Sequence, residues 1–240
     1  MTVPRNEAGR PWNELARLDG LTSVLDPADA RGGKNRLIHR VHLRALSKAL
    51  GPVRGERALD FGCGTGRISS WLVRNRATVE GVDATAEMVD VARANVSGAA
   101  FHVIDGSSLP FEPERFDVVI SVYVLQYYVT RDEHILRELT RVLRSGGRLV
   151  AIEQVTDSDI GRGASSAEYR RSFEAAGLQV VRIDPVRRFD SRVVHVGQRF
   201  PLLSHLPGLA SLAMREARSV DMSALTGGSY VDALICTRKP

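Results

Sequence analysis

The chain has 240 residues, of which 43% are hydrophobic and 25% charged, a composition that supports a globular fold with a substantial core and excludes intrinsic disorder. The formal net charge is +5, but the basic residues are spread along the chain and are nearly all arginine, so the charge does not by itself indicate a nucleic-acid partner. Cys63 and Cys236 are the only cysteines, which excludes a disulfide framework and gives no basis for a metal site.

From Arg57 to Glu153, short β-branched apolar runs alternate with longer helical patterns. Residues 1–33 are rich in turns, and residues 34–49 then form an amphipathic helix. The predicted strands occupy residues 57–61, 78–82, 100–104, 116–122, 148–153, 178–184 and 230–237. The predicted helices between them occupy residues 67–75, 86–95, 131–143 and 166–176. This order predicts an α/β fold built from βαβ units around a mostly parallel sheet.

Two segments lie outside the alternation and suggest a division of the chain. We expect a helical cap over residues 1–50, a core over 51–185, an insertion over 186–228 and a final strand of the core over 229–240. The insertion contains helical patterns such as Leu209 to Arg218. An insertion of this length is rarely a bare loop, so we expect it to be a lid or a substrate-binding segment.

A glycine-rich loop follows the first predicted strand. The strand Ala58-Leu59-Asp60-Phe61 leads into Gly62-Cys63-Gly64-Thr65-Gly66, and a helix begins at Arg67. Alternating glycines allow a tight turn and close approach of a ligand to the backbone, while the helix N-terminus offers free N–H donors. The spacing is G-x-G-x-G, and Arg67 stands where the dinucleotide fingerprint has its third glycine, which disfavours NAD.

Polar residues also follow the second and third predicted strands. Asp83 ends the second strand, where a carboxylate can accept hydrogen bonds from the two hydroxyls of a ribose. Asp105 and Gly106 follow the third strand, within reach of an adenine if the strands are neighbours. Ligands bind at the carboxyl ends of strands in open α/β sheets, so these residues together predict a site for an adenosine-containing cofactor.

Residues 57–153 resemble a class I S-adenosyl-L-methionine (SAM)-dependent methyltransferase of the branch that acts on small molecules. The matching motifs are Ala58 to Gly66, Gly81-Val82-Asp83 with Glu87-Met88, Ile104-Asp105-Gly106 with Leu109-Pro110-Phe111, Phe116-Asp117-Val118-Val119, and Arg141 to Gly147. The resemblance implies a Rossmann-like, seven-stranded, mostly parallel sheet with helices on both faces and an antiparallel last strand. It also implies SAM as the cofactor and S-adenosyl-L-homocysteine (SAH) as its product.

The resemblance further assigns residues to the cofactor. Asp60, Gly62 and Gly64, with Gly66 completing the loop, would face its methionine part. Asp83 would face the ribose hydroxyls, Met88 would pack near the adenine, and Asp105 would accept from the adenine amino group. Ala84 and Gly106, which follow the two aspartates, are also expected to bind the cofactor. Ser121, at the end of the fourth strand, would lie near the methionine amine and the sulfonium.

Methyl transfer requires alignment of the acceptor more than acid–base chemistry, and a base only where the acceptor must lose a proton. Glu153 and Gln154, which end the fifth strand, are candidates for holding a substrate hydroxyl or amine, and His195 is the candidate base. Tyr127 follows the fourth strand with Tyr123, Gln126 and Tyr128, and these tyrosines occupy a position where many family members have a histidine. His39 and His42 fall on the helix 34–49, where a solvated basic face is the simplest interpretation.

The expected acceptor is a small molecule methylated on oxygen or nitrogen, such as a natural product, a sugar or an acidic metabolite. An acidic acceptor would be favoured if two or more of Arg187, Arg188, Arg192 and Arg199 faced the cleft. RNA or protein methylation and a non-catalytic SAM-binding regulatory role stay open as alternatives. Because no apolar signal core or long apolar run occurs, we expect a cytoplasmic protein without a membrane partner, either a monomer or a homodimer, with nucleic acid an improbable partner.

Overall fold

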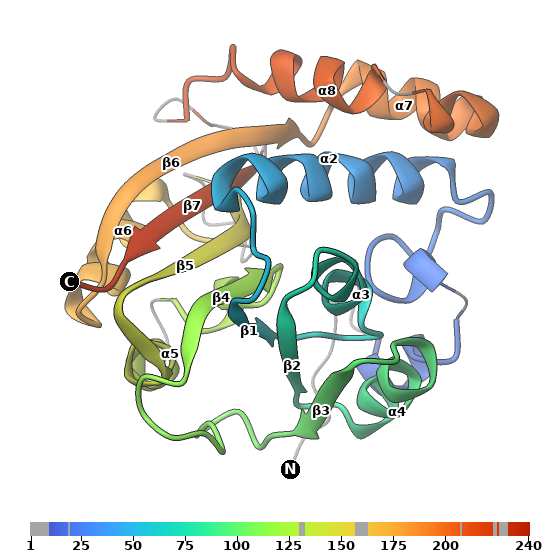
Figure 1. Cartoon of the computed structure of the whole chain (residues 1–240). Helices are drawn as coiled ribbons and strands as arrows, with labels where there is room; N and C mark the ends of the chain where they lie inside the picture. Colours follow the sequence, from blue (N-terminus) through green and yellow to red (C-terminus); the bar gives the residue numbers. More distant parts are fainter. Residues whose placement is uncertain are drawn as a thin grey trace.

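The computed structural model describes residues 10–18, 20–129, 133–156, 163–206, 208–222, 225 and 230–240. Its centre is a seven-stranded sheet with the strand order β3-β2-β1-β4-β5-β7-β6 (Figure 1). The strands are β1 (Arg57–Phe61), β2 (Thr78–Asp83), β3 (Ala99–Val103), β4 (Phe116–Val122), β5 (Leu143–Val155), β6 (Gln179–Arg188) and β7 (Val231–Arg238). The neighbouring strands from β3 to β5 pair in parallel, and β7 lies antiparallel between β5 and β6. The predicted Rossmann-like α/β fold with an antiparallel last strand is confirmed.

Helices cover both faces of this sheet. They are α1 (Trp12–Leu15), α2 (Gly33–Leu50), α3 (Arg67–Arg74), α4 (Ala86–Asn95), α5 (Glu133–Val142), α6 (Ser166–Ala175), α7 (Arg192–Arg199) and α8 (Leu209–Ala217), with the 3-10 turns η1 (Gly20–Ser23), η2 (Leu125–Tyr127) and η3 (Pro201–His205). One face packs against α2, α3, α7 and α8 and is called the α2 face below. The other packs against α5 and α6 and is called the α5 face.

The alternation of side chains along β5 shows how one sequence serves both faces. Val150 and Ile152 belong to the core on the α2 face, whereas Leu149 and Ala151 belong to the core on the α5 face. Successive residues of a strand point to opposite faces, so a strand covered on both sides needs an almost continuous apolar sequence. By the same alternation Glu153 is directed to the α5 face and Gln154 to the α2 face.

The late insertion forms a layer outside α2. In Figure 1, α7 and α8 lie along the outer side of α2, and both helices contact α2. β6 continues to Arg188, so the predicted boundary at residue 186 falls within a strand. Among the described residues, none of the helices combines the length and the apolar character required to cross a membrane. Residues 1–9, the predicted helix start at 131–132 and the predicted boundary between 228 and 229 lie outside the described residues.

Candidate functional site

The glycine loop is held against β2 by its own backbone. The N–H groups of Gly62 and Cys63 both donate to the carbonyl oxygen of Val82 at 2.9 Å, and the loop glycines have positive φ angles, 73° at Gly62 and 51° at Gly64. A Cβ atom on Gly62 would lie 2.2 Å from the Val124 side chain. Neither the backbone conformation nor the space admits a side chain there, so the loop presents bare backbone.

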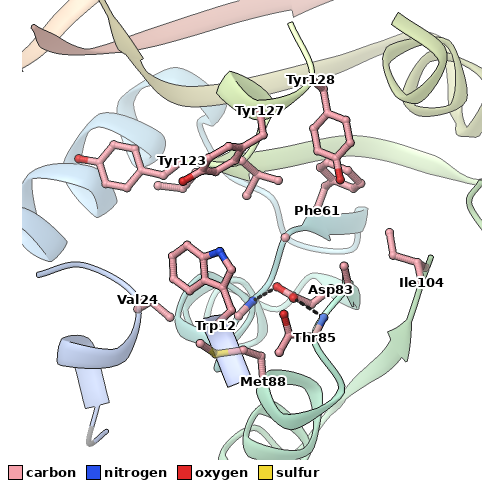
Figure 2. A pocket seen from close by; sticks show the side chains of 15 residues that line it. Trp12, Val24, Phe61, Asp83, Thr85, Met88, Ile104, Tyr123, Tyr127 and Tyr128 are labelled. Carbon is pink, nitrogen blue, oxygen red and sulfur yellow. Dashed lines mark hydrogen bonds between the residues drawn. The ribbon is translucent and has the colours of Figure 1, made fainter. Parts of the chain in front are cut away.

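Asp83 closes the other side of this loop. One carboxylate oxygen accepts from the N–H of Gly64 and the other from the N–H of Thr85, each at 2.9 Å (Figure 2). Burial is the largest influence on this carboxyl and raises its pKa above the ordinary value, although the backbone N–H donors oppose the shift. Each carboxylate oxygen can accept further hydrogen bonds, so Asp83 retains acceptor capacity toward a ligand.

A cleft of about 310 Å³ opens above the loop and Asp83. Its lining consists of Trp12, Val24, Phe61, Gly62, Gly64, Asp83, Ala84, Thr85, Met88, Ile104, Val122, Tyr123, Val124, Tyr127 and Tyr128. Five of the predicted cofactor residues are therefore together in one cavity, namely Gly62, Gly64, Asp83, Ala84 and Met88. Its size and its largely apolar walls with a few polar groups are typical of a small-ligand site.

Other predicted cofactor residues lie behind or beside the cleft. The carboxylate of Asp60 accepts from the backbone N–H and the hydroxyl of Ser69, so it ties β1 to α3, and burial raises its pKa to about 6. Gly66 is the left-handed residue before α3, and a Cβ there would lie 2.8 Å from the Val96 side chain. Neither residue lines the cleft.

The predicted adenine contacts are placed near the rim. Asp105 is exposed, and its carboxylate accepts from the N–H and the hydroxyl of Ser107, which lowers its pKa. A Cβ on Gly106 would lie 3.3 Å from the hydroxyl of Tyr128, a residue that does line the cleft. Gly106 thus lies beside a lining residue, and neither Asp105 nor Gly106 lines the cleft itself.

Glu153 is completely buried and anchors the turn that follows β4. It accepts from the N–H groups of Val124, Leu125 and Gln126 at 3.3, 3.0 and 3.3 Å, and from the hydroxyl of Ser121 at 3.3 Å. Burial raises the pKa of Glu153 to about 7, against the opposing influence of these donors. Glu153 and Ser121 therefore fix η2, which carries Tyr127, rather than lining a cavity themselves.

A second cavity, of about 270 Å³, adjoins the first. Its lining consists of Trp12, Leu15, Ser23, Val24, Leu25, Asp26, Pro27, Lys34, Ile38, Tyr123, Gln126, Tyr127, Gln154, Arg187, Phe189 and Tyr230. Trp12, Val24, Tyr123 and Tyr127 line both cavities and form the wall that the two share. In Figure 2 the side chain of Tyr127 reaches toward Trp12 across the cleft. The predicted candidate Tyr127 is thus at the junction of the two cavities.

Tyr123 is held at this wall by a buried polar cluster. Its φ angle is 63°, and its hydroxyl points away from the cleft (Figure 2) and donates to Asp232 at 2.6 Å. Asp232 also binds the guanidinium of Arg187, and the ring of His42 lies 3.2 Å from the Tyr123 hydroxyl. A positive φ is costly for a tyrosine, so this cluster maintains a conformation that the local sequence disfavours.

The histidines occupy different places from those that their sequence contexts suggest. His42 is fully buried, which lowers its pKa to about 4 and corrects the interpretation of a solvated helix face. His195 is exposed on α7, where its ring contacts the carbonyl oxygen of Ser191 at 2.9 Å. His195 lines neither cavity.

The polar cluster and the wall residues Trp12 and Val24 were not identified from the sequence. One signal was available, because Asp232 interrupts the apolar run of the last strand. The pairing of Asp232 with Arg187 could not be predicted, because Arg187 faces Asp232 only through the register shift between Pro185 and Arg187. Of the four arginines considered for an acidic acceptor, only Arg187 lines a cavity.

Comparison with known proteins connects this arrangement to a family. Residues 59–151 match the family described as "Methyltransferase domain". The chain is 38% identical over 148 residues to a demethylmenaquinone methyltransferase of Clavibacter sepedonicus, covering 60% of this chain and 59% of that protein. It is 31% identical over 147 residues to a fatty-acid O-methyltransferase of Mycolicibacterium smegmatis, covering 60% of this chain and 51% of that protein. The chain thus spans between half and three fifths of the length of these two relatives.

Among solved structures, the fold is similar to one in a complex between the Trm112 methyltransferase activator of Haloferax volcanii and its methyltransferase partner. That comparison has a TM-score of 0.66 and 22% identity, and it covers 100% of both chains. At this identity the likeness concerns the fold alone.

Proposed function

We propose that this chain, whose residues 59–151 belong to the class I SAM-dependent methyltransferase family, transfers a methyl group from SAM to an oxygen or nitrogen atom of a small-molecule acceptor. The observation that carries the proposal is the pair of adjoining cavities, one above the glycine loop and Asp83, the other sharing four lining side chains with it. Two substrates that exchange a methyl group need two such sites in contact.

The first cavity fits the cofactor. Gly62 and Gly64 leave no room for side chains, so the methionine part of SAM would lie against bare backbone. Asp83 would accept from the ribose hydroxyls with the lone pairs that Gly64 and Thr85 leave free. Met88, which is buried against Leu15 and Ala16, would contact the base. When bound, SAM supplies a methyl group activated by its sulfonium.

The second cavity would hold the acceptor. The acceptor atom would form its bond to the methyl carbon as the carbon–sulfur bond breaks, with the bonding electrons remaining on sulfur and the proton of the acceptor's O–H or N–H group released to water. The protein's part is alignment, which can account for much of the rate. Tyr127 and Tyr123 line both cavities, and Glu153 acts as a positioning residue because it binds the backbone of the turn ahead of Tyr127.

Replacement of Asp83 by alanine is expected to weaken SAM binding about 10- to 100-fold. A hydrogen bond to a charged group contributes about 1.5 to 3 kcal/mol to binding. The variant also removes the carboxylate that accepts the hydrogen bond from the N–H of Gly64. Isothermal titration of SAM and SAH into both proteins measures the change. Asp90→Ala is the matched control, because Asp90 is an exposed aspartate that pairs with Arg93 on α4. Its affinity should equal that of the unmodified protein.

Absence of SAM binding to the unmodified protein would refute the proposed function. With binding established, incubation with methyl-labelled SAM and fractionated cell extract identifies the acceptor class. Label in small metabolites supports the proposal. Label in RNA or protein supports the macromolecular alternative, and no label in any fraction supports a non-catalytic SAM-binding role.

A further inference from the structure

We infer that the second cavity selects an uncharged acceptor with an aromatic ring and a hydroxyl or N–H group that donates a hydrogen bond to the side-chain oxygen of Gln154. This inference rests on the proposed function, since it names the acceptor class of the same site. Three features of the cavity carry it: an unpaired acceptor atom, cations whose charges are already compensated, and aromatic walls.

The position of Gln154 follows from the sheet register. Gln154 on β5 faces Asp232 on β7, and Asp232 in turn faces Arg187 on β6. Residues that face each other on neighbouring strands project from the same side of a sheet. These three side chains therefore form a polar row on the α2 face, and the second cavity lies over Gln154 and Arg187 at its two ends.

In the described part of the chain, the side-chain oxygen of Gln154 is an unpaired hydrogen-bond acceptor. The residue is only 6% exposed, and its Oε1 atom is buried without a hydrogen-bond partner among the described residues. Its backbone, by contrast, is satisfied, because its N–H donates to Gln126 and its carbonyl oxygen accepts from Tyr169. A buried acceptor left unpaired costs about 1 to 3 kcal/mol. A donor on the ligand would remove this cost.

The charges around the cavity favour a neutral ligand. Lys34 forms an ion pair with Asp26 at 2.6 Å, and Arg187 binds Asp232 through two nitrogen atoms. Burial is the largest influence and acts to raise the pKa of Asp232, but Arg187 and His42 together outweigh it and keep the pKa below the ordinary value. Both cations that line the cavity in the described part of the chain are thus already neutralised by ionised carboxylates. An anionic acceptor would have to compete with Asp26 and Asp232 for them.

Aromatic side chains supply much of the remaining wall. Trp12, Tyr123 and Tyr127 also border the cofactor cleft, and Phe189 and Tyr230 line the second cavity alone, with their ring centroids 4.7 Å apart. Flat rings pack well against such walls in offset or edge-to-face contact. An acceptor with an aromatic ring matches this lining.

A naphthalene series tests the inference on the unmodified, SAH-bound protein. Binding is followed by the fluorescence of 2-naphthol, 2-methoxynaphthalene and 2-naphthoate, which share one ring system. We expect 2-naphthol to bind about tenfold more tightly than 2-methoxynaphthalene, which lacks a donor, and more tightly than the anionic 2-naphthoate. Preferential binding of 2-naphthoate, equal binding of the naphthol and its ether, or no binding of 2-naphthol would each overturn the inference.

The variant Gln154→Leu locates the effect at one atom. It should reduce 2-naphthol affinity about tenfold and leave 2-methoxynaphthalene affinity almost unchanged, whereas Gln198→Leu, at an exposed position on α7, should change neither. Unaltered 2-naphthol binding by folded Gln154→Leu would contradict the assignment. SAM titration of the unmodified protein separates the two proposals: SAM binding with the wrong ligand preference refutes the acceptor class alone, while failure to bind SAM refutes the function. The same titration of each variant checks that its cofactor site is intact.

Discussion

Replacement of Asp232 by alanine is expected to lower the free energy of unfolding by about 3 to 5 kcal/mol. The substitution leaves the Arg187 guanidinium buried without its carboxylate and removes the acceptor of the Tyr123 hydroxyl. An uncompensated buried charge is among the most costly defects in a protein core. Urea denaturation of the variant and the unmodified protein, followed by circular dichroism, measures the difference.

The adjacent pair Arg188–Asp190 provides a matched control. It has the same residue types, but Asp190 is 64% exposed at its side chain, so Asp190→Ala should cost no more than about 1 kcal/mol. The double variant Arg187→Met/Asp232→Leu should recover much of the stability lost in Asp232→Ala, because it removes both buried charges. Equal losses in Asp232→Ala and Asp190→Ala would show that the buried pair has no special role.

The second large effect is a loss of stability between pH 5 and pH 8 that depends on Glu153. Its pKa is about 7 in the folded protein against an ordinary value of 4.5, chiefly through burial, so the folded state binds the proton more tightly than the unfolded chain does. The resulting stability is fully present below pH 4.5 and is lost as the pH rises through about 7. The difference corresponds to about 3 kcal/mol.

Urea denaturation at several pH values, compared with Glu153→Gln, isolates this titration. Buried groups such as Asp60 and His42 titrate in both proteins, so the difference between the two curves belongs to Glu153. The variant should lose less stability than the unmodified protein as the pH rises. Glu114→Gln, at a largely exposed position, should follow the unmodified protein. Parallel curves for Glu153→Gln and the unmodified protein would be incompatible with a raised pKa.

The fold could be predicted from the sequence because most of its helices and strands are determined by local sequence patterns. The strands 57–61 and 116–122 and the helix 86–95 have the predicted bounds, since each is set by a periodic apolar pattern and a clear flanking turn. β5 and β6 are longer than predicted. Their added residues include Arg144 to Gly147, which span a register shift between β4 and β5 and form backbone hydrogen bonds with Lys239, and Arg187, which pairs with Asp232 beyond a register shift in β6. Neither departure follows from a local apolar pattern.

The cofactor site was only partly readable. Gly62, Gly64 and Asp83 follow strand ends, so sequence order alone brings them together. Asp60 and Glu153 also lie on or near strand ends, but their carboxylates bind Ser69 and the backbone of η2 instead. Whether a polar group at a strand end turns toward the ligand or back into the fold depends on side-chain packing that the pattern does not encode.

The second cavity could not be predicted because distant parts of the chain meet there. Trp12 and Val24 come from the N-terminal region, Gln154 from β5 and Tyr230 from the residue before β7. No local period or spacing links them. Their meeting depends on α2 crossing the sheet and on β7 lying between β5 and β6.

The place of β7 in the sheet also constrains the order of folding. β7 is the last strand along the described chain, yet it supplies the hydrogen bonds to both β5 and β6. β6 is therefore synthesised before β7, the strand with which it pairs in the described sheet, and Arg187 is synthesised before Asp232. The separation is larger for Tyr123, because Asp232, which accepts its hydrogen bond, lies 109 residues further along the chain. Closure of the sheet and neutralisation of the buried cation are thus one late, long-range event, which favours slow folding.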